Sequence, residues 1–104
     1  MFDSLKDKKI LYVEDDTEVL ENISELLQNY FEKFYKALDG EMGHNIFLGQ
    51  DIDICIIDIQ LPTISGIELI RKIRESNKDV YIIVISSHIK TDYFLKLHPC
   101  REWH

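Results

Sequence analysis

Short apolar runs alternate with amphipathic segments along this chain, and this alternation constrains its fold more than any other feature. The predominantly apolar runs cover residues 10–13, 34–38, 52–57 and 80–85, and Lys36 and Asp53 are the only charged residues within them. Apolar runs of this kind are typical of strands that are buried on both faces. Between them, apolar residues recur at helical spacing. These helical patterns cover residues 19–30, 40–49 and 67–77, and a weaker one runs from near Lys90 to Pro99.

Strands that alternate with helices predict a parallel sheet with helices on both faces. Right-handed crossovers and short connections then leave only a few topologies. For a single domain covering residues 1–104, we predict a flavodoxin-like, doubly wound α/β fold with strand order 2-1-3-4. In that order the first and third strands are neighbours, so their carboxyl ends lie side by side at one edge of the sheet.

The composition of the chain narrows the classes of partner. Its formal net charge is −7, which argues against direct binding of nucleic acid, because phosphate backbones require basic surfaces. Every apolar run is far shorter than the roughly 20 residues that cross a bilayer, and residues 1–6 lack the layout of a secretory signal. We therefore expect a cytoplasmic protein with no membrane partner.

Cys55 lies within an apolar run and is expected to be a core residue rather than a nucleophile.

Acidic residues end two of the predicted strands. Glu14-Asp15-Asp16 follows the first apolar run, and Asp58 follows the third and opens a turn that contains proline and glycine. Open α/β sheets bind ligands at the carboxyl ends of their strands, so we expect Glu14, Asp15 and Asp58 to converge there. Carboxylates at such close range repel one another unless some are protonated or a cation lies between them.

The types of ligand in these clusters favour one class of cation. Neither cluster contains histidine or cysteine, and ligands that are all oxygen favour Mg²⁺ or Mn²⁺ over zinc. Ser86 and Ser87 end the fourth apolar run at the same edge, where a hydroxyl can donate a hydrogen bond to a phosphoryl oxygen. A cation site, a nucleophilic carboxylate and a hydroxyl donor together suit phosphoryl transfer onto an aspartate.

Polar residues at the predicted helix starts have a second interpretation as caps. Ser65-Gly66-Ile67-Glu68 has the pattern of a capping box, in which the serine and glutamate side chains accept hydrogen bonds from free N–H groups of the helix. Asp15 and Asp16 are both candidates for the N-cap of the first helix. Capping and cation binding are compatible for such neighbouring residues. His44 lies at a helical position that suits an apolar residue, so we expect it to be partly buried rather than catalytic.

Three segments together resemble the receiver domain of bacterial two-component response regulators. They are Val13-Glu14-Asp15-Asp16, Asp58-x-x-Leu61-Pro62-x-x-x-Gly66 and the strand that ends in Ser86. They occur in the family's order and spacing. The resemblance covers about residues 8–96 and leaves residues 97–104 as an atypical tail.

The resemblance implies a role for each matching residue. Asp58 matches the aspartate that accepts the phosphoryl group from a histidine kinase or phosphotransfer protein. Glu14 and Asp15 match the acid pair that binds Mg²⁺, and Gln60 matches the position whose backbone carbonyl completes the metal site with Asp58. Ser86 matches the hydroxyl residue that moves toward the phosphoryl group on activation. Such a domain catalyses its own phosphorylation and slow dephosphorylation and is otherwise not an enzyme, and the phosphoryl group switches its protein interactions.

The sequence differs from the family pattern after the fourth predicted strand. Receivers continue into a fifth strand and helix, with a lysine that pairs with the acceptor aspartate, and this segment is missing from the chain. Lys96 does not replace that lysine, because it lies on the predicted fourth helix. An uncovered fourth strand is an edge that can pair with another chain. We therefore expect a homodimer or strand exchange through the exposed edge of the fourth strand, or else low stability of the chain.

Two other hypotheses stay open. Without the lysine, the chain is a truncated receiver-like module that binds proteins but is not phosphorylated. Mass measured after treatment with acetyl phosphate separates this hypothesis from the first. A Mg²⁺-dependent phosphatase with an aspartyl nucleophile is less well supported, because such enzymes need a second aspartate at the position that Gln60 occupies.

Overall fold

The structure, a computed structural model, describes residues 5–85 of the chain. These residues form four strands, three α-helices and one turn of 3₁₀ helix, in the order β-α-η-β-α-β-α-β. The elements are β1 (Lys9–Val13), α1 (Thr17–Leu27), η2 (Gln28–Tyr30), β2 (Lys33–Ala37), α2 (Gly40–Gly49), β3 (Ile54–Asp58), α3 (Gly66–Ser76) and β4 (Tyr81–Ile85). The predicted fourth helix lies outside the described residues.

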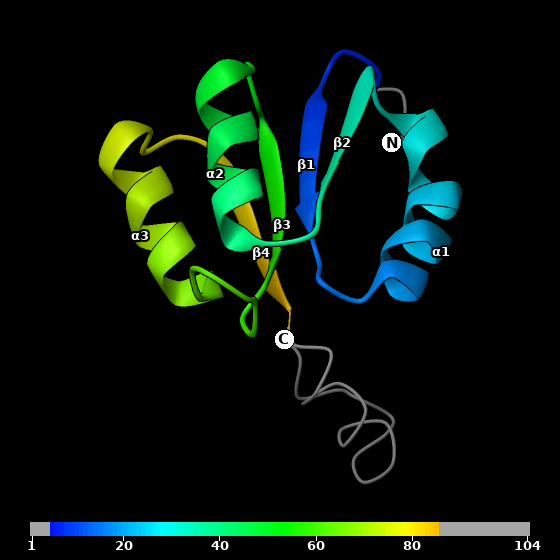
Figure 1. Ribbon diagram of the computed structural model, residues 1–104. Helices are drawn as coiled ribbons and strands as arrows, with labels where there is room; N and C mark the ends of the chain where they lie inside the picture. Colours follow the sequence, from blue (N-terminus) through cyan, green and yellow to red (C-terminus); the bar gives the residue numbers. More distant parts are fainter. Residues whose placement is uncertain (1–4, 86–104) are drawn as a thin grey trace, which may run out of the picture.

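The strands form one parallel sheet with the order β2-β1-β3-β4. Helices α2 and α3 lie on one side of the sheet and α1 lies on the other (Figure 1). This is the predicted flavodoxin-like arrangement, and the strand order 2-1-3-4 is confirmed. Because β1 and β3 are neighbours, with Val13 paired to Ile57, their carboxyl ends meet at the lower edge of the sheet in Figure 1.

The main core lies between the sheet and the pair α2 and α3. Leu11 and Val13 of β1 and Cys55 and Ile57 of β3 point into it, because alternate residues of a strand face the same side. Helices α2 and α3 and the adjoining loops fill it with Phe47, Ile52, Leu69, Ile73 and Val80. This cluster explains the apolar residues at alternate positions of β1 and β3.

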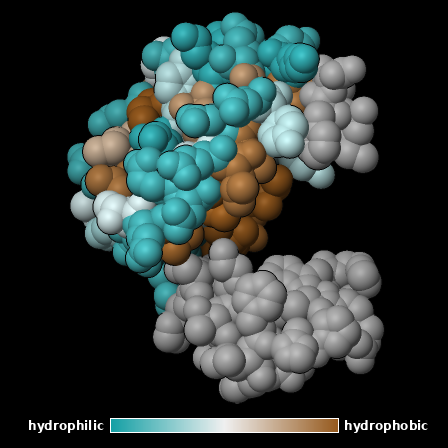
Figure 2. Space-filling model, turned by 90° about the vertical axis from the view of Figure 1, so that its right-hand side faces the viewer, coloured by the Kyte–Doolittle hydropathy of each residue, from teal (hydrophilic) through white to brown (hydrophobic). Residues whose placement is uncertain are grey.

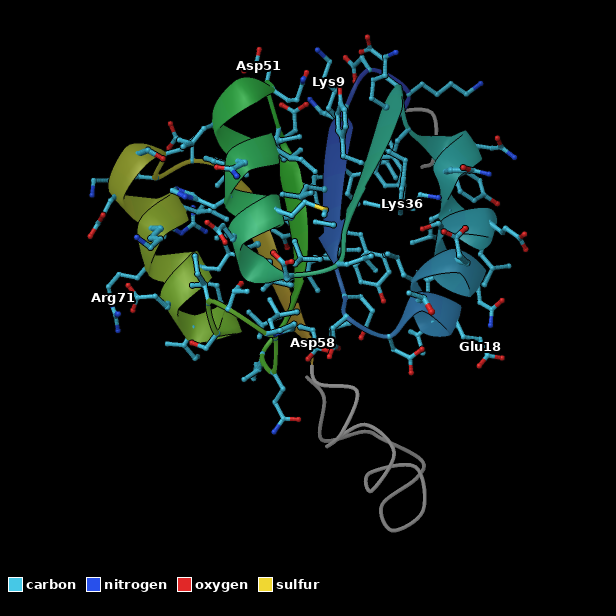
Figure 3. All side chains as sticks on the ribbon, in the orientation of Figure 1. Lys9, Glu18, Lys36, Asp51, Asp58 and Arg71 are labelled. Carbon is cyan, nitrogen blue, oxygen red and sulfur yellow. The ribbon has the colours of Figure 1, made fainter. Side chains whose placement is uncertain are left out.

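The opposite face of the sheet is covered less completely. Tyr12, Ile56 and Ile83 are neighbours in the strand register and lie on this face, the side on which α1 packs. Lys36 of β2 extends toward α1, where its ammonium group pairs with Glu21 at 3.3 Å (Figure 3). Figure 2 shows a broad apolar surface beside the polar surface of this side of the molecule. Ile83 is 41% exposed, so β4 contributes to the apolar surface of residues 5–85.

Helix α2 has the predicted ends, whereas several other element ends differ from the prediction by one to three residues. Helix α1 ends at Leu27, because the chain tightens into the 3₁₀ turn Gln28–Tyr30 instead of continuing as an α-helix. Strand β3 begins at Ile54 and includes Asp58, whereas the apolar pattern placed the strand at residues 52–57. Apolar patterns mark burial rather than strand pairing, so Ile52 is buried in the core although it precedes the strand.

Each of the three α-helices within residues 5–85 has a polar N-cap. Asp16 caps α1 by accepting hydrogen bonds from the N–H groups of Glu18 and Val19, and Asp39 caps α2 in the same way through Met42. Ser65 caps α3 by accepting from the N–H of Glu68 at 3.2 Å, which is one half of the predicted capping box. In the other half the structure differs, because the Glu68 carboxylate pairs with Arg71 one turn along the helix.

Candidate functional site

Three carboxylates meet at the edge of the sheet where β1 and β3 end. Glu14 and Asp15 follow β1 directly, and Asp58 is the last residue of β3. Their oxygens all lie within 4.8 Å of one another. Figure 3 shows Asp58 at this lower edge of the molecule. The parallel register of β1 and β3 therefore produces the convergence that the sequence led us to expect.

Glu14 is fully buried and held by both of its carboxylate oxygens. Oε1 accepts a hydrogen bond from the Tyr12 hydroxyl at 3.4 Å, and Oε2 accepts one from the N–H of Asp16 at 3.2 Å. Burial raises the pKa of Glu14 to about 7, helped by the hydrogen bond and negative charge of Asp58, although the Asp16 N–H lowers it. In the absence of a cation, part of the negative charge in the cluster is thus removed by protonation.

Asp58 is also fully buried, and the N–H groups of the two residues that follow it are both hydrogen-bonded. The N–H of Gln60 donates to Asp58 Oδ1 at 3.1 Å. The N–H of Ile59 donates to the carbonyl of Ile85 at 2.9 Å, which ties the exit of β3 to the end of β4. A carboxylate held in this way has a defined direction, as a nucleophile in a group transfer requires.

The loop after Asp58 folds back against the start of α2. Thr63 has a φ of 66°, a left-handed conformation that is strained for a β-branched residue. Its hydroxyl accepts a hydrogen bond from the N–H of Glu41 at 3.3 Å, and the Pro62 carbonyl accepts one from Gly40. The N–H of Gly66 donates to the carbonyl of Ile59 at 2.7 Å. These contacts close the loop into a compact turn beneath the carboxylates.

The carboxylate cluster fits a hard divalent cation. Asp15 is exposed, so a cation between these side chains keeps access to water and to a ligand from solution. Mg²⁺ takes oxygen ligands, usually one or two protein carboxylates, and fills its other positions with water or phosphate oxygens. Asp16 faces the helix as the N-cap of α1, where its side chain accepts hydrogen bonds from the N–H groups of Glu18 and Val19.

The structure describes some of the other residues that the sequence analysis considered, and not all of them. Gln60 is exposed and lies next to Asp58 in the turn, and its N–H contacts that carboxylate. Ser86, Ser87 and His88 lie outside the described residues. His44 is partly buried on α2, as expected.

Cys55 is buried in the core, and burial raises the pKa of its thiol to about 12. A thiol is nucleophilic only as the thiolate, so the structure agrees with a packing role for Cys55.

One residue beside the site was not singled out from the sequence. Tyr12 was predicted as an ordinary strand residue, yet its hydroxyl contacts Glu14. The signal was present, since residues two apart in a strand point to the same face. A tyrosine two positions before an acid at a strand end is therefore a candidate hydrogen-bond partner of that acid.

Comparison with known proteins identifies the family. The family model for the response regulator receiver domain matches residues 10–99. This chain belongs to that family. The receiver resemblance seen in the sequence is confirmed, and so is the receiver fold.

Curated relatives of this receiver domain are larger proteins. The transcriptional regulatory protein RprY of Bacteroides fragilis is 34% identical over 91 residues, which are 84% of this chain and 37% of RprY. The response regulator GtcR of Aneurinibacillus migulanus is 30% identical over 90 residues and is likewise matched over 37% of its length. The chain therefore spans little more than a third of the curated relatives that it matches.

Two solved structures of a related response regulator include a bound group or a partner protein. The response regulator TrrA of Thermotoga maritima, in complex with Mg²⁺-BeF, is 36% identical with a TM-score of 0.69, over 82% of this chain and 76% of TrrA. TrrA was also solved in complex with the histidine kinase ThkA, and in that comparison it covers 77% of this chain at 35% identity, with a TM-score of 0.69. Within residues 5–85, no helix of the receiver described here is long and apolar enough to cross a membrane.

Proposed function

We propose that this receiver domain accepts a phosphoryl group from a histidine kinase on Asp58 and thereby switches its protein interactions in the cytoplasm. The observation that carries the proposal is the position of Asp58, which is fully buried yet within 4.8 Å of the oxygens of Glu14 and Asp15. Structural cores exclude such clusters, because buried carboxylates repel one another. Clusters of this kind are found where a cation and a charged substrate compensate them.

The residues of the site have complementary roles in this proposal. Glu14 and Asp15 hold Mg²⁺ together with Asp58 and the backbone carbonyl of Gln60, and Ser86 binds the transferred group. The cation supplies positive charge that compensates the carboxylates and the phosphoryl oxygens. The complexes of the related TrrA with Mg²⁺-BeF and with ThkA support both the cation and the donor.

The transfer itself is a substitution at phosphorus. An oxygen of Asp58 attacks the phosphorus of a phosphohistidine, the phosphorus–nitrogen bond breaks, and its electron pair goes to the imidazole. An acyl phosphate forms on Asp58, and later attack by water releases phosphate. The hydrogen bond from the Gln60 N–H holds Asp58 Oδ1, so the carboxylate is oriented before the donor arrives.

Treatment with acetyl phosphate and Mg²⁺ tests the proposal directly. We expect the intact protein to gain the mass of one phosphoryl group, and Asp58→Asn to abolish the gain, because an amide oxygen is not a competent nucleophile here. Asp51→Asn is the matched control, since Asp51 is exposed at the opposite end of the sheet (Figure 3). Intact-mass spectrometry measures both variants.

The same measurement decides between the proposal and its alternative. If the wild-type chain gains no mass with acetyl phosphate, the receiver fold serves as a non-phosphorylatable module for protein binding. A gain that persists in Asp58→Asn would assign the acceptor to another residue.

A second copy of this chain is a further proposed partner, through the edge of β4. Among residues 5–85, β4 pairs only with β3, and its side chains Tyr81, Ile83 and Val84 are 66%, 41% and 43% exposed. We expect the chain to be a dimer in light scattering at micromolar concentration and Tyr81→Lys to shift it toward monomer. Leu48→Lys, at a 60% exposed position on α2, is expected to leave the dimer intact. A stable wild-type monomer contradicts this proposal.

A further inference from the structure

The hydroxyl of Tyr12 contacts the carboxylate cluster from within β1, at 3.4 Å from Glu14 Oε1. Tyr12 is 1% exposed, and its ring packs edge-on against Phe34 with centroids 6.5 Å apart. The ring is therefore fixed between β1 and β2, and its only polar atom is directed along β1 to Glu14, two residues later. A buried hydroxyl needs a partner, and here the partner is a carboxylate of the site.

Glu14 differs from Asp15 and Asp58 in the length of its side chain. The extra methylene lets the carboxylate take several directions, so the protein must hold it if it is to face a cation in one orientation. Two donors do so from opposite oxygens, the Tyr12 hydroxyl at 3.4 Å and the Asp16 N–H at 3.2 Å. The backbone donor is present whatever the side chain, whereas the hydroxyl depends on a tyrosine at position 12.

We propose that Tyr12 is a positioning residue for the cation site, and that its hydroxyl orients Glu14 and thereby strengthens binding of Mg²⁺. The inference rests on the proposed function, because it assumes that Glu14 faces the cation. Groups that hydrogen-bond to metal ligands fix their direction, and their removal typically weakens metal binding about 10- to 100-fold. The geometry places Tyr12 in this relation to Glu14.

Two further observations support a donor role. Burial and the carboxylate of Glu14 raise the pKa of the Tyr12 hydroxyl, so it keeps its proton throughout the physiological range. The contact with Glu14 is also longer than the roughly 2.7–2.8 Å that is usual between hydroxyl and carboxylate oxygens. It has room to shorten when a cation orients the Glu14 carboxylate.

The test uses the hydroxyl alone as the variable. Tyr12→Phe keeps the ring that packs against Phe34 and removes only the donor. Tyr35→Phe is the matched control, because the Tyr35 hydroxyl on the adjacent strand β2 donates to Gln50 Oε1 at 3.1 Å and not to the site. Both variants and the wild type are titrated with Mg²⁺ by calorimetry and by near-ultraviolet absorption, which reports the hydrogen bonding of tyrosine hydroxyls.

We expect Tyr12→Phe to bind Mg²⁺ about tenfold more weakly than the wild type. We also expect the wild type to show a tyrosine difference band on addition of Mg²⁺, which Tyr12→Phe loses and Tyr35→Phe retains. If Tyr12 had a purely structural role, addition of Mg²⁺ would produce no such band in the wild type, and Tyr12→Phe would alter stability alone.

Other outcomes separate this inference from the proposed function. If the wild type and Tyr12→Phe bind Mg²⁺ with equal affinity, Tyr12 has no positioning role, but the proposed cation site is unaffected. Equal weakening in Tyr35→Phe also overturns it, because the effect would then not be specific to Glu14. A wild-type chain that binds no Mg²⁺ overturns both the proposed cation site and the inference built on it.

Discussion

Gly66→Ala is expected to lower the free energy of unfolding by about 3 kcal/mol, the upper part of the range for overpacked sites. A methyl group on Gly66 would lie 2.6 Å from the Cα of Ile59 and would also meet the backbone carbonyls of Asp58 and Ile59. Backbone atoms cannot rotate away as a side chain can, so the turn after β3 must shift. Chemical denaturation followed by circular dichroism measures the loss.

Gly49→Ala is the matched control for this prediction. Gly49 is the last residue of α2, and a methyl group there meets no atom within 4 Å. We expect its unfolding free energy to change by less than about 1 kcal/mol, since alanine favours the helix and restricts the unfolded chain. Equal unfolding midpoints for the two variants would show that the turn accommodates a side chain.

Gly66→Ala also tests the link between the turn after β3 and the carboxylate site. Gly66 packs against the carbonyl of Asp58, the residue that we propose as the phosphoryl acceptor. A shift of the turn would therefore move the acceptor relative to Glu14 and Asp15. We expect the phosphorylation by acetyl phosphate to fall in Gly66→Ala even under conditions where most of the protein is folded.

The stability of the metal-free protein is expected to fall as pH rises through the range from about 4.5 to about 7. The folded protein raises the pKa of Glu14 from 4.5 to about 7, chiefly through burial. Between these values the folded state holds a proton that the unfolded state has lost, so folding is favoured at the acid end and the advantage disappears toward pH 7. The shift corresponds to a loss of at most about 3 kcal/mol, because one pKa unit is worth about 1.4 kcal/mol.

Two variants at acidic positions, Glu14→Gln and Glu18→Gln, test whether this pH dependence of stability comes from Glu14. In Glu14→Gln we expect the fall in stability to be largely absent, because the amide neither repels Asp58 nor titrates. Glu18→Gln, at an exposed position in the first turn of α1, is expected to keep the wild-type profile. Urea denaturation at several pH values measures all three proteins. An unchanged slope in Glu14→Gln would mean that Glu14 keeps an ordinary pKa.

Addition of Mg²⁺ is expected to restore the stability that the metal-free protein loses as the pH rises to 7 and above. A cation that binds only the folded state raises the unfolding free energy by about 2.7 kcal/mol at 100 times its dissociation constant. It also compensates the ionised carboxylates, so the wild type should gain more stability from Mg²⁺ near pH 8 than near pH 5. Glu14→Gln should gain less than the wild type, since one ligand of the proposed site has lost its charge.

The fold was predictable because its signals are local and repeated. Each strand reads as a short apolar run and each helix as a spacing of apolar residues, and physical rules for crossovers then leave few arrangements. The element ends were less predictable, as the 3₁₀ turn at Gln28–Tyr30 shows. Apolar residues continue through Tyr30, and only tertiary packing determines where the α-helix stops.

The acidic residues of the candidate site could be predicted from the sequence. The groups that hydrogen-bond to these residues and orient them could not. Glu14, Asp15 and Asp58 stand at strand ends, and strand order alone brings them to one edge. The sequence left Asp15 and Asp16 as equal candidates for the cap of α1, and the backbone path selects Asp16. It gave no warning of the strained Thr63 or of the contact between Tyr12 and Glu14, because both depend on distances across the folded chain.

The sequence by itself determined the parallel α/β class, the strand order and the edge of the sheet at which three carboxylates meet. It could do so because the apolar periodicity that defines strands and helices is a local property of the sequence. Only the tertiary structure decided how those carboxylates are held. Burial raises the pKa of Glu14, and the Tyr12 hydroxyl and Asp16 N–H fix its orientation. Such effects depend on which groups exclude water from one another, and that is settled when the strands and helices pack.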